Sequence, residues 1–329
     1  MAQTARTTRR EGSNGHGDQR PPEGPTDLAT RSWWGALKRS AKEFKKDHLS
    51  DWAAALTFYA VLAIFPALLV FVALVGLFGK YPQTTNELLK IVKELGPSSA
   101  VDTFRKPVEG VVRNRGGASA LLGIGLLGAV WSASGYVGAF MRAANRIYEV
   151  EEGRPPWKLR PIQLLVTLAM VLGAALVAIA VVVSGPVARS IGDAVGLGDT
   201  AVTVWNIAKW PVLAVVVVTM FAVLYYAAPN VRVRFRWLSP GGVAALLIWL
   251  IASGAFAFYV ANFGSYNATY GSLGGVIIFL VWMWITNLAV LLGLEFNAEL
   301  ERSRELELGT PGAEHEIKLP PRQRKTVRS

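Results

Sequence analysis

The chain has 329 residues, of which 52% are hydrophobic and 17% are charged. Soluble globular proteins carry about a quarter charged residues, so this composition argues against a soluble domain. The 34 Lys and Arg exceed the 23 Asp and Glu, which gives a formal net charge of +11. The chain contains no cysteine, which excludes disulfides, thiolate zinc sites and thiol catalysis.

The N-terminal part is polar and basic. Residues 1–30 are rich in Gly, Pro, Thr, Arg and Asp, and we expect a disordered cytoplasmic tail. Residues 31–51 predict a basic amphipathic helix, whose apolar positions recur at spacings of three or four: Trp34, Leu37, Ala41, Phe44 and His48. Its lysines are expected to contact anionic lipid headgroups of the inner leaflet: Lys38, Lys42, Lys45 and Lys46. An ordinary solvated helix is the alternative.

Long stretches of the chain lack charge altogether. Six stretches contain no Asp, Glu, Lys or Arg: residues 52–79, 118–140, 161–188, 210–228, 238–261 and 272–294. A helix needs about 20 apolar residues to cross the roughly 30 Å hydrocarbon core of a bilayer. The stretches are also rich in Gly and Ala, which allow helices to pack closely in lipid. The sequence therefore predicts an all-α polytopic membrane bundle of six transmembrane helices over residues 52–301.

Two segments outside these stretches have different expected structures. In residues 80–117, Thr84 and Glu87 form a capping-box pattern that opens an apolar stripe, which predicts a helical outer loop between the first two spans. Both a gate and a static lid are open roles for this loop. Residues 302–329 are expected to form a second disordered cytoplasmic tail.

The distribution of basic residues predicts the orientation of the bundle. An N-terminus inside the cell places 25 of the 34 Lys and Arg on the cytoplasmic side, as the positive-inside rule requires. Both termini are therefore expected in the cytoplasm. Residues 1–30 have no apolar segment of signal-peptide type, so we expect the first span to act as an uncleaved anchor.

Several short sequences are distinctive. They are Leu56-Thr-Phe-Tyr-Ala-Val-Leu-Ala-Ile-Phe-Pro66, Tyr225-Tyr-Ala-Ala-Pro229-Asn230, Ser239-Pro-Gly241-Gly, Thr269-Tyr270-Gly271-Ser272 and Leu292-Gly-Leu-Glu295-Phe-Asn297-Ala-Glu299. Together they resemble the YihY/virulence factor BrkB family of bacterial membrane proteins, over roughly residues 40–301. One departure is Ala63, where the family pattern usually has Ser. The resemblance implies six spans in the bacterial inner membrane with both ends cytoplasmic. An older family label is ribonuclease BN, and export or lipid translocation has been suggested for the family.

The residue inventory speaks against the nuclease label. A metal-dependent nuclease needs several His, Asp or Glu ligands that converge on one site. The three histidines, His16, His48 and His315, are far apart in sequence, and the six stretches contain no carboxylate. We therefore expect no catalytic site, no metal and no cofactor. Lipid accounts for the positive charge, so no nucleic-acid partner is expected.

A transport path would need polar groups within the bundle, because unpaired polar groups in hydrocarbon are unfavourable. The candidates for a path or gate are Tyr59, Pro66, Asn262, Tyr270, Asn287 and Glu295. For Pro66 the alternative is a structural kink, and for Asn287 it is an interhelical hydrogen bond. The helix dipole disfavours a carboxylate at the inner end of the sixth span, so Glu295 is hypothesised to pair with Arg142 or Arg146.

Two functions remain open at this stage. The first is a transporter or translocator of a lipid or solute, which predicts a cavity lined by the first, fifth and sixth spans. The second is a membrane scaffold, in which a solid bundle binds a protein partner or another copy of the chain. A cavity of several hundred cubic ångströms would favour the first function.

Overall fold

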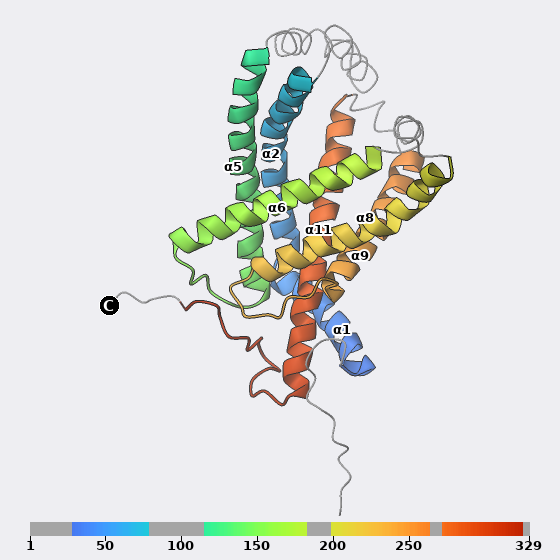
Figure 1. Ribbon diagram of the computed structural model, residues 1–329. Coiled ribbons are helices and arrows are strands. Elements are labelled where there is room, and N and C mark those ends of the chain that lie inside the picture. Colours follow the sequence, from blue (N-terminus) through green and yellow to red (C-terminus); the bar gives the residue numbers. More distant parts are fainter. Residues whose placement is uncertain (1–27, 79–114, 183–198, 264–271, 325–329) are drawn as a thin grey trace, which may run out of the picture.

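The computed structural model describes residues 28–78, 115–182, 199–263 and 272–324, and in these residues the fold is helical (Figure 1). Its helices are α1 (Thr30–Lys46), α2 (Leu49–Phe78), α5 (Arg115–Ile147), α6 (Pro156–Val182), α8 (Asp199–Ala227), α9 (Pro240–Phe263) and α11 (Ser272–Glu307). Within the described residues, four helices are long and apolar enough to cross a membrane: α6, α8, α9 and α11. A shorter apolar stretch, Leu49–Ile64, lies in α2.

The helices pack as pairs that cross one another. Helix α2 lies beside α5, and α9 lies beside α11 (Figure 1). Helix α11 also packs on α2, which joins the two pairs. Helices α6 and α8 contact each other and run obliquely across the other helices, with α6 packed on α5. Helix α1 packs on α11 near the lower end of the view.

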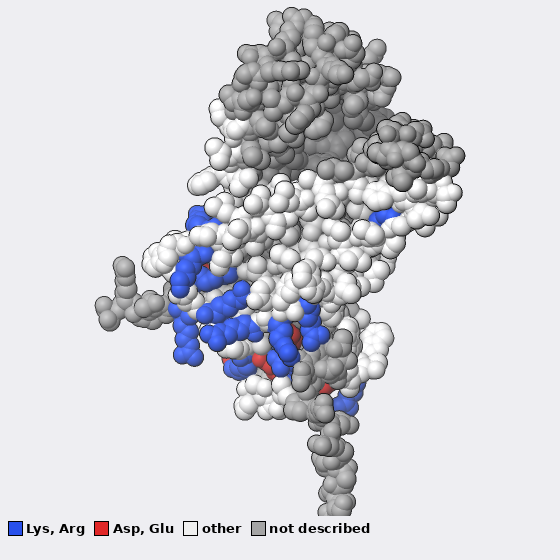
Figure 2. Space-filling model, viewed as in Figure 1, with Lys and Arg blue, Asp and Glu red and all other residues white. Residues whose placement is uncertain are grey.

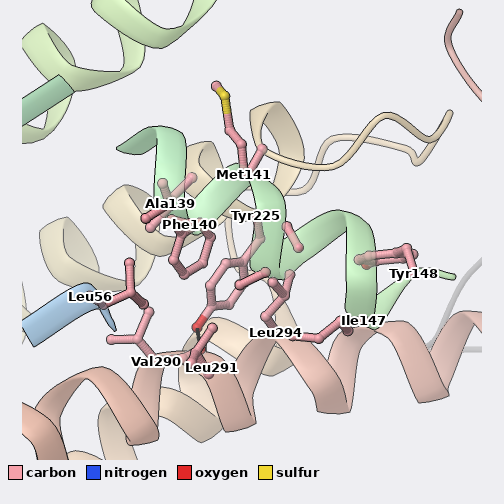
Figure 3. Close-up of a cluster of buried hydrophobic side chains, with 14 of the residues drawn as sticks. Leu56, Ala139, Phe140, Met141, Ile147, Tyr148, Tyr225, Val290, Leu291 and Leu294 are labelled. Carbon is pink, nitrogen blue, oxygen red and sulfur yellow. Dashed lines mark hydrogen bonds between the residues drawn. The ribbon is translucent and has the colours of Figure 1, made fainter. Parts of the chain in front are cut away.

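The apolar core lies where α2, α5, α8 and α11 meet (Figure 3). Tyr225 of α8 stands within it, and its ring stacks on Phe140 with centroids 6.2 Å apart. The Tyr225 hydroxyl donates a 2.6 Å hydrogen bond to the backbone carbonyl of Val290. The hydroxyl is the one polar side-chain atom that Tyr225 brings into this core, and the bond to Val290 satisfies it as a donor.

Large apolar side chains also cover the outer faces of the oblique and outer helices. Leu165 on α6 is 67% exposed, Ile207 on α8 is 69% exposed and Ile251 on α9 is 73% exposed. Lys and Arg gather instead at the lower part of the visible face, around the ends of the helices (Figure 2). An apolar surface of this extent is stable against hydrocarbon, not against water.

Helices α9 and α11 approach each other at two glycines. A Cβ on Gly293 would lie 2.4 Å from the carbonyl oxygen of Gly241, so this contact is possible only without side chains. Next to it, the Asn297 side-chain oxygen accepts a 2.8 Å hydrogen bond from the backbone N–H of Gly241. Ser239 accepts a 3.3 Å bond from the Gly242 N–H and caps the start of α9. The first turn of α9 is thereby fixed to α11.

The polar segments at the lower end are bonded to one another. The Asn230 backbone N–H donates a 2.7 Å hydrogen bond to the Asn145 side-chain oxygen, and the Asn230 side-chain amide donates to the Gln323 carbonyl at 2.8 Å. Arg154 is buried and donates to the Ala227 and Ala228 carbonyls at the end of α8, at 3.1 and 2.8 Å. These bonds satisfy helix-end carbonyls that would otherwise lack partners.

The C-terminal segment differs from the expectation of disorder from residue 302. Helix α11 continues to Glu307, and the following residues are described to 324. Arg302 donates to the Ala313 and Glu314 carbonyls at 2.9 and 2.7 Å, and Arg322 donates to the Val231 carbonyl at 2.8 Å. Helix α11 thus extends past the expected start of this tail, and the arginines of the segment bind main-chain carbonyls of the folded part.

Two helix boundaries also differ from the expected ones. Helix α1 ends at Lys46 instead of 51, because His48 adopts a positive φ of 53° that a helix cannot continue through. Helix α8 begins at Asp199 instead of 210. The prediction stopped at the charge of Lys209, but this side chain is buried, lies 3.4 Å from the Asn206 amide oxygen and sits over the Trp210 ring. Most of the expected outer loop, residues 80–117, and the first 27 residues of the tail lie outside the described residues.

Candidate functional site

A large cavity lies in the middle of the helix bundle. Its volume is about 670 Å³, and it is partly open. All six long helices contribute to its wall, so it is not confined to the first, fifth and sixth predicted spans. The lining residues are Ala60, Ala63, Ala133, Tyr136, Val137, Thr167, Met170, Val171, Ala174, Val177, Val217, Met220, Phe221, Leu224, Leu246, Trp249, Trp282, Thr286 and Val290. We call this space the central cavity.

The polar groups at the wall of the central cavity are bonded to each other. The Tyr136 hydroxyl donates to the Asn287 side-chain oxygen at 2.8 Å, and the Asn287 amide donates to the Thr57 hydroxyl at 3.0 Å. On the other side, the Trp249 indole N–H donates to the Thr286 hydroxyl at 3.1 Å. Because these groups satisfy one another across α2, α5, α9 and α11, they offer little to a polar ligand. The central cavity therefore suits an apolar group.

A second space lies near the start of α6, and we call it the basic pocket. It has a volume of about 490 Å³. Its lining residues come from α2, α5, α6 and the α5–α6 connection: Tyr59, Gly135, Gly138, Met141, Arg142, Glu152, Pro156, Leu159, Arg160 and Gln163. Glu152, the carboxylate in this lining, is bonded to Arg154 at 2.7 and 2.8 Å. The two arginines of the lining therefore leave the basic pocket with uncompensated positive charge.

The basic pocket and the central cavity lie on either side of α5. Helical geometry, at about 3.6 residues per turn, puts Ala133 and Val137 on one face and Gly135 and Arg142 on nearly the opposite face. Gln163 of α6 is buried at the crossing, where its amide donates to the Ser134 carbonyl of α5. On one face of α6, residues up to Gln163 line the basic pocket, and residues from Thr167 onward line the central cavity.

Buried carboxylates form a third group at the lower end, the carboxylate cluster of Glu43, Asp47, Glu295 and Glu299. All four are at most 9% exposed. Arg39 and Arg302 both bind Glu299, and Lys46 lies 2.9 Å from Glu43. This pairing stabilises Glu43 and Glu299, because an unpaired buried charge is strongly unfavourable.

The hypothesised pair of Glu295 with Arg142 or Arg146 is not formed. Arg146 binds Asp47 instead, at 3.2 Å, and donates to the Lys46 carbonyl. Glu295 is 1% exposed, and among the described residues its Oε2 atom has no hydrogen-bond partner. The prediction failed because α1 and the turn after it bring Asp47 to Arg146. This contact joins distant segments, and it cannot be inferred from which helix ends lie on the same side of the membrane.

Asp47 gives the carboxylate cluster a pH dependence. Burial raises the pKa of Asp47 from its ordinary value of 3.8 to about 6, although Arg146 and Lys46 oppose the rise. A folded-state pKa above the unfolded one means that the folded protein holds the proton more tightly. The stability that this group contributes is present below pH 3.8 and is lost as the pH rises through about 6.

We therefore expect the detergent-solubilised protein to melt at a higher temperature at pH 4.5 than at pH 7. Asp47→Asn should make this difference in melting temperature smaller. The amide does not titrate, so the melting temperature of this variant should change less over the same pH window. Melting curves followed by tryptophan fluorescence at several pH values measure this. Parallel pH profiles for the two proteins would rule out Asp47 as the source.

The remaining predicted site residues are dispersed. Tyr59 lines the basic pocket, whereas Asn262 is exposed and bonds its amide to the Phe258 carbonyl of its own helix. Pro66 lies within α2, but its side chain is outside the described residues, as is Tyr270 altogether. The structure thus buries Asn287 behind the wall of the central cavity, bonded to Tyr136, and places Tyr59 and Arg142 in the lining of the basic pocket.

Sequence reasoning missed two residues of the basic pocket, Arg160 and Gln163. A signal was available, because Arg160 immediately precedes an uncharged stretch and Gln163 is a polar residue three positions later. This spacing puts both on one face of a helix. In the structure, Arg160 donates to the Gln163 amide oxygen at 3.2 Å.

Comparison with known sequences identifies the family. The profile of the family described as "Virulence factor BrkB" matches residues 40–317. The chain belongs to the virulence factor BrkB family. YfkH of Bacillus subtilis (strain 168), which is named as ribonuclease-like, is 33% identical over 254 residues, covering 77% of this chain and 90% of YfkH. No solved structure matches the chain.

Other relatives are named as membrane proteins. A UPF0761 membrane protein of Alkalilimnicola ehrlichii is 32% identical over 268 residues, which are 79% of this chain and 57% of that longer relative. A UPF0761 membrane protein of Alteromonas mediterranea is 26% identical over 265 residues, covering 80% of this chain and 87% of the relative. The apolar helices and the names of these relatives together show that this BrkB-family chain is a membrane protein.

Proposed function

We propose that this BrkB-family protein moves a molecule with a large apolar part, a lipid or a lipophilic solute, across the membrane. The observation that carries the proposal is the central cavity, a partly open space of about 670 Å³ lined by six helices. Binding sites for small molecules typically measure about 300–1,000 Å³ and are mostly apolar. A scaffold needs no such space within its bundle, so the cavity favours translocation over the scaffold alternative.

The proposal includes six membrane crossings, by α2, α5, α6, α8, α9 and α11. Helices α2 and α5 have 30 and 33 residues, and at about 1.5 Å per residue either is longer than the roughly 30 Å hydrocarbon core. The segments that join the lower helix ends bond to one another, and Lys and Arg gather on that side (Figure 2). By the positive-inside rule, this end with α1 and the C-terminal segment lies in the cytoplasm of a bacterial cell.

Helix α1 is proposed to contact anionic lipid with one side. Its Ala36, Ser40 and Glu43 are buried, whereas Trp34 and Leu37 are 61% and 51% exposed. The exposed apolar side chains are flanked by exposed lysines: Lys38, Lys42, Lys45 and Lys46. Apolar groups next to lysines suit the boundary between acyl chains and anionic headgroups.

The proposed function includes no hydrolytic step. In the described residues, no group of three or more His, Asp or Glu is arranged to hold a metal ion. His48 and His315 are exposed and lie 3.7 and 3.9 Å from Asp51 and Glu314, and neither lines the central cavity or the basic pocket.

The test is lipid movement in reconstituted liposomes that contain NBD-labelled phosphatidylglycerol. Dithionite bleaches labels in the outer leaflet, so faster loss of the protected fraction reports translocation. We expect the full chain to accelerate this loss, and Ala133→Phe combined with Ala174→Phe to slow it by about tenfold or more, equal to roughly 1.4 kcal/mol of barrier. Both alanines line the central cavity.

Ala169→Phe is the matched control, since Ala169 is exposed on another face of α6 and does not line the central cavity. This variant should retain the wild-type rate. No acceleration over protein-free liposomes, with labelled phosphatidylglycerol, phosphatidylethanolamine and phosphatidylcholine alike, would refute lipid translocation. Equal rates for the cavity-filled variant and the control would exclude the central cavity as the path.

A further inference from the structure

We propose that the basic pocket binds the phosphate headgroup of a membrane phospholipid, held by Arg142 and Arg160. This inference concerns binding and holds whether or not the lipid is subsequently moved. It assigns to the basic pocket a ligand different from the apolar group that suits the central cavity.

The charge balance of the basic pocket points to an anion. Arg142 is exposed to the pocket and forms no hydrogen bond or ion pair with any described residue. Arg160 bonds to the neutral Gln163 amide and not to a carboxylate. Glu152 is already occupied by Arg154 and by Asn145, at 2.9 Å. Guanidinium groups bind phosphate oxygens through paired, charge-assisted hydrogen bonds, so two of them match one headgroup phosphate.

The pocket is built to hold Arg160 in place. The buried Gln163 side chain accepts from Arg160 and donates to the Ser134 carbonyl of α5, so it links the arginine to the helix opposite. Gly138 leaves room for this side chain, since a Cβ there would lie 2.7 Å from the Gln163 nitrogen. Gly135 similarly accommodates Tyr59, whose ring atom would lie 3.2 Å from a Cβ. Arg160 is therefore oriented before any ligand binds.

The depth of the pocket favours a lipid over a free anion. Trp157 at the start of α6 is 74% exposed, and exposed tryptophans at span ends lie at the headgroup level. Met141 and Leu159 line the same pocket, and Leu164 and Leu165 are exposed on the next turn of α6. A headgroup at the arginines would thus have its acyl chains against apolar side chains. A free phosphate would use the arginines alone.

The test is equilibrium binding of a phosphatidic acid with one NBD-labelled acyl chain to the full chain in detergent micelles, followed by fluorescence anisotropy. We expect Arg142→Gln combined with Arg160→Gln to raise the Kd by tenfold or more, about 1.4 kcal/mol. The control is Arg232→Gln combined with Arg324→Gln, which removes the same charge from exposed positions of the lower end. Its Kd should stay within about twofold of wild type.

Three outcomes would overturn the inference. Equal Kd values for the two double variants would show that general surface charge holds the lipid. Wild-type affinity for labelled diacylglycerol, which lacks the phosphate, would show that apolar contacts alone suffice. Full competition by inorganic phosphate at millimolar concentration would identify a free anion as the ligand. If lipid binding depends on the arginines but the protein moves no lipid in the liposome assay, the headgroup site is supported. Only the proposed translocation is then refuted.

Discussion

Gly293→Ala should lower the stability of the protein by about 3 kcal/mol, near the upper end for overpacked sites. The added Cβ would lie 2.4 Å from the Gly241 carbonyl oxygen, 2.6 Å from the Ala245 Cβ and 2.8 Å from the Tyr225 hydroxyl. The first two belong to the backbone and the first side-chain atom of α9, so neither can rotate away. The helices would have to separate, which breaks the Asn297 bond to the Gly241 N–H. The melting temperature in detergent, followed by tryptophan fluorescence, measures the loss.

Gly254→Ala is the matched control for this prediction. Gly254 also lies in a membrane helix, but a Cβ there meets no atom within 4 Å. Alanine favours the helix by up to about 1 kcal/mol over glycine, so this variant should be as stable as wild type or more so. Wild-type melting of Gly293→Ala would mean that α9 and α11 do not approach as closely as described.

Helix positions could be predicted from the sequence because hydrocarbon excludes charge so strongly. The prediction of helix boundaries failed where a charged residue is buried inside the protein. Lys209 lies within α8, bonded to Asn206 and over an indole ring, and Glu299 lies within α11, bonded to two arginines. A rule that stops at a charged residue therefore starts α8 too late and ends α11 too early. Only the partner, which comes from elsewhere in the chain for Glu299, shows that the helix continues.

The candidate site was harder to predict than the helices. The sequence indicated Asn287 as a candidate because a polar residue in an apolar stretch needs a partner. It did not indicate that the partners are Tyr136 and Thr57. The wall of the central cavity is made mainly of Ala, Val and Met, which look like any lipid-facing or core residue in the sequence. A cavity is a property of how helices are spaced, and no local pattern encodes it.

The distinctive sequences of the family fall mainly on the framework and not on the central cavity. Tyr225 bonds to α11, Asn230 joins the α8–α9 connection to the C-terminal segment, and Gly241 and Gly293 allow α9 to meet α11. All of these contacts lie toward the lower end of the bundle. They hold α8, α9 and α11 together there.

Glu299→Gln should destabilise the protein by about 3–5 kcal/mol, the range for breaking a buried ion pair by removing one partner. The Glu299 side chain is 2% exposed and binds Arg39 of α1 and Arg302 of α11. The Arg302 side chain is itself 7% exposed. A neutral amide would leave two guanidinium groups with little compensation, one of them buried. We expect a melting temperature lowered by roughly 6–20 °C, at about 2–4 °C per kcal/mol for a large domain.

Glu301→Gln provides the control on the same helix. Glu301 binds Arg304 at 2.8 Å with the same spacing of three residues as Glu299 and Arg302, but its side chain is 16% exposed and that of Arg304 is 25% exposed. Water can solvate both groups after the substitution, so the expected loss is at most about 1 kcal/mol. If both variants melted alike, burial would not distinguish the two pairs, and Glu299 would not be what fastens α1 to the bundle.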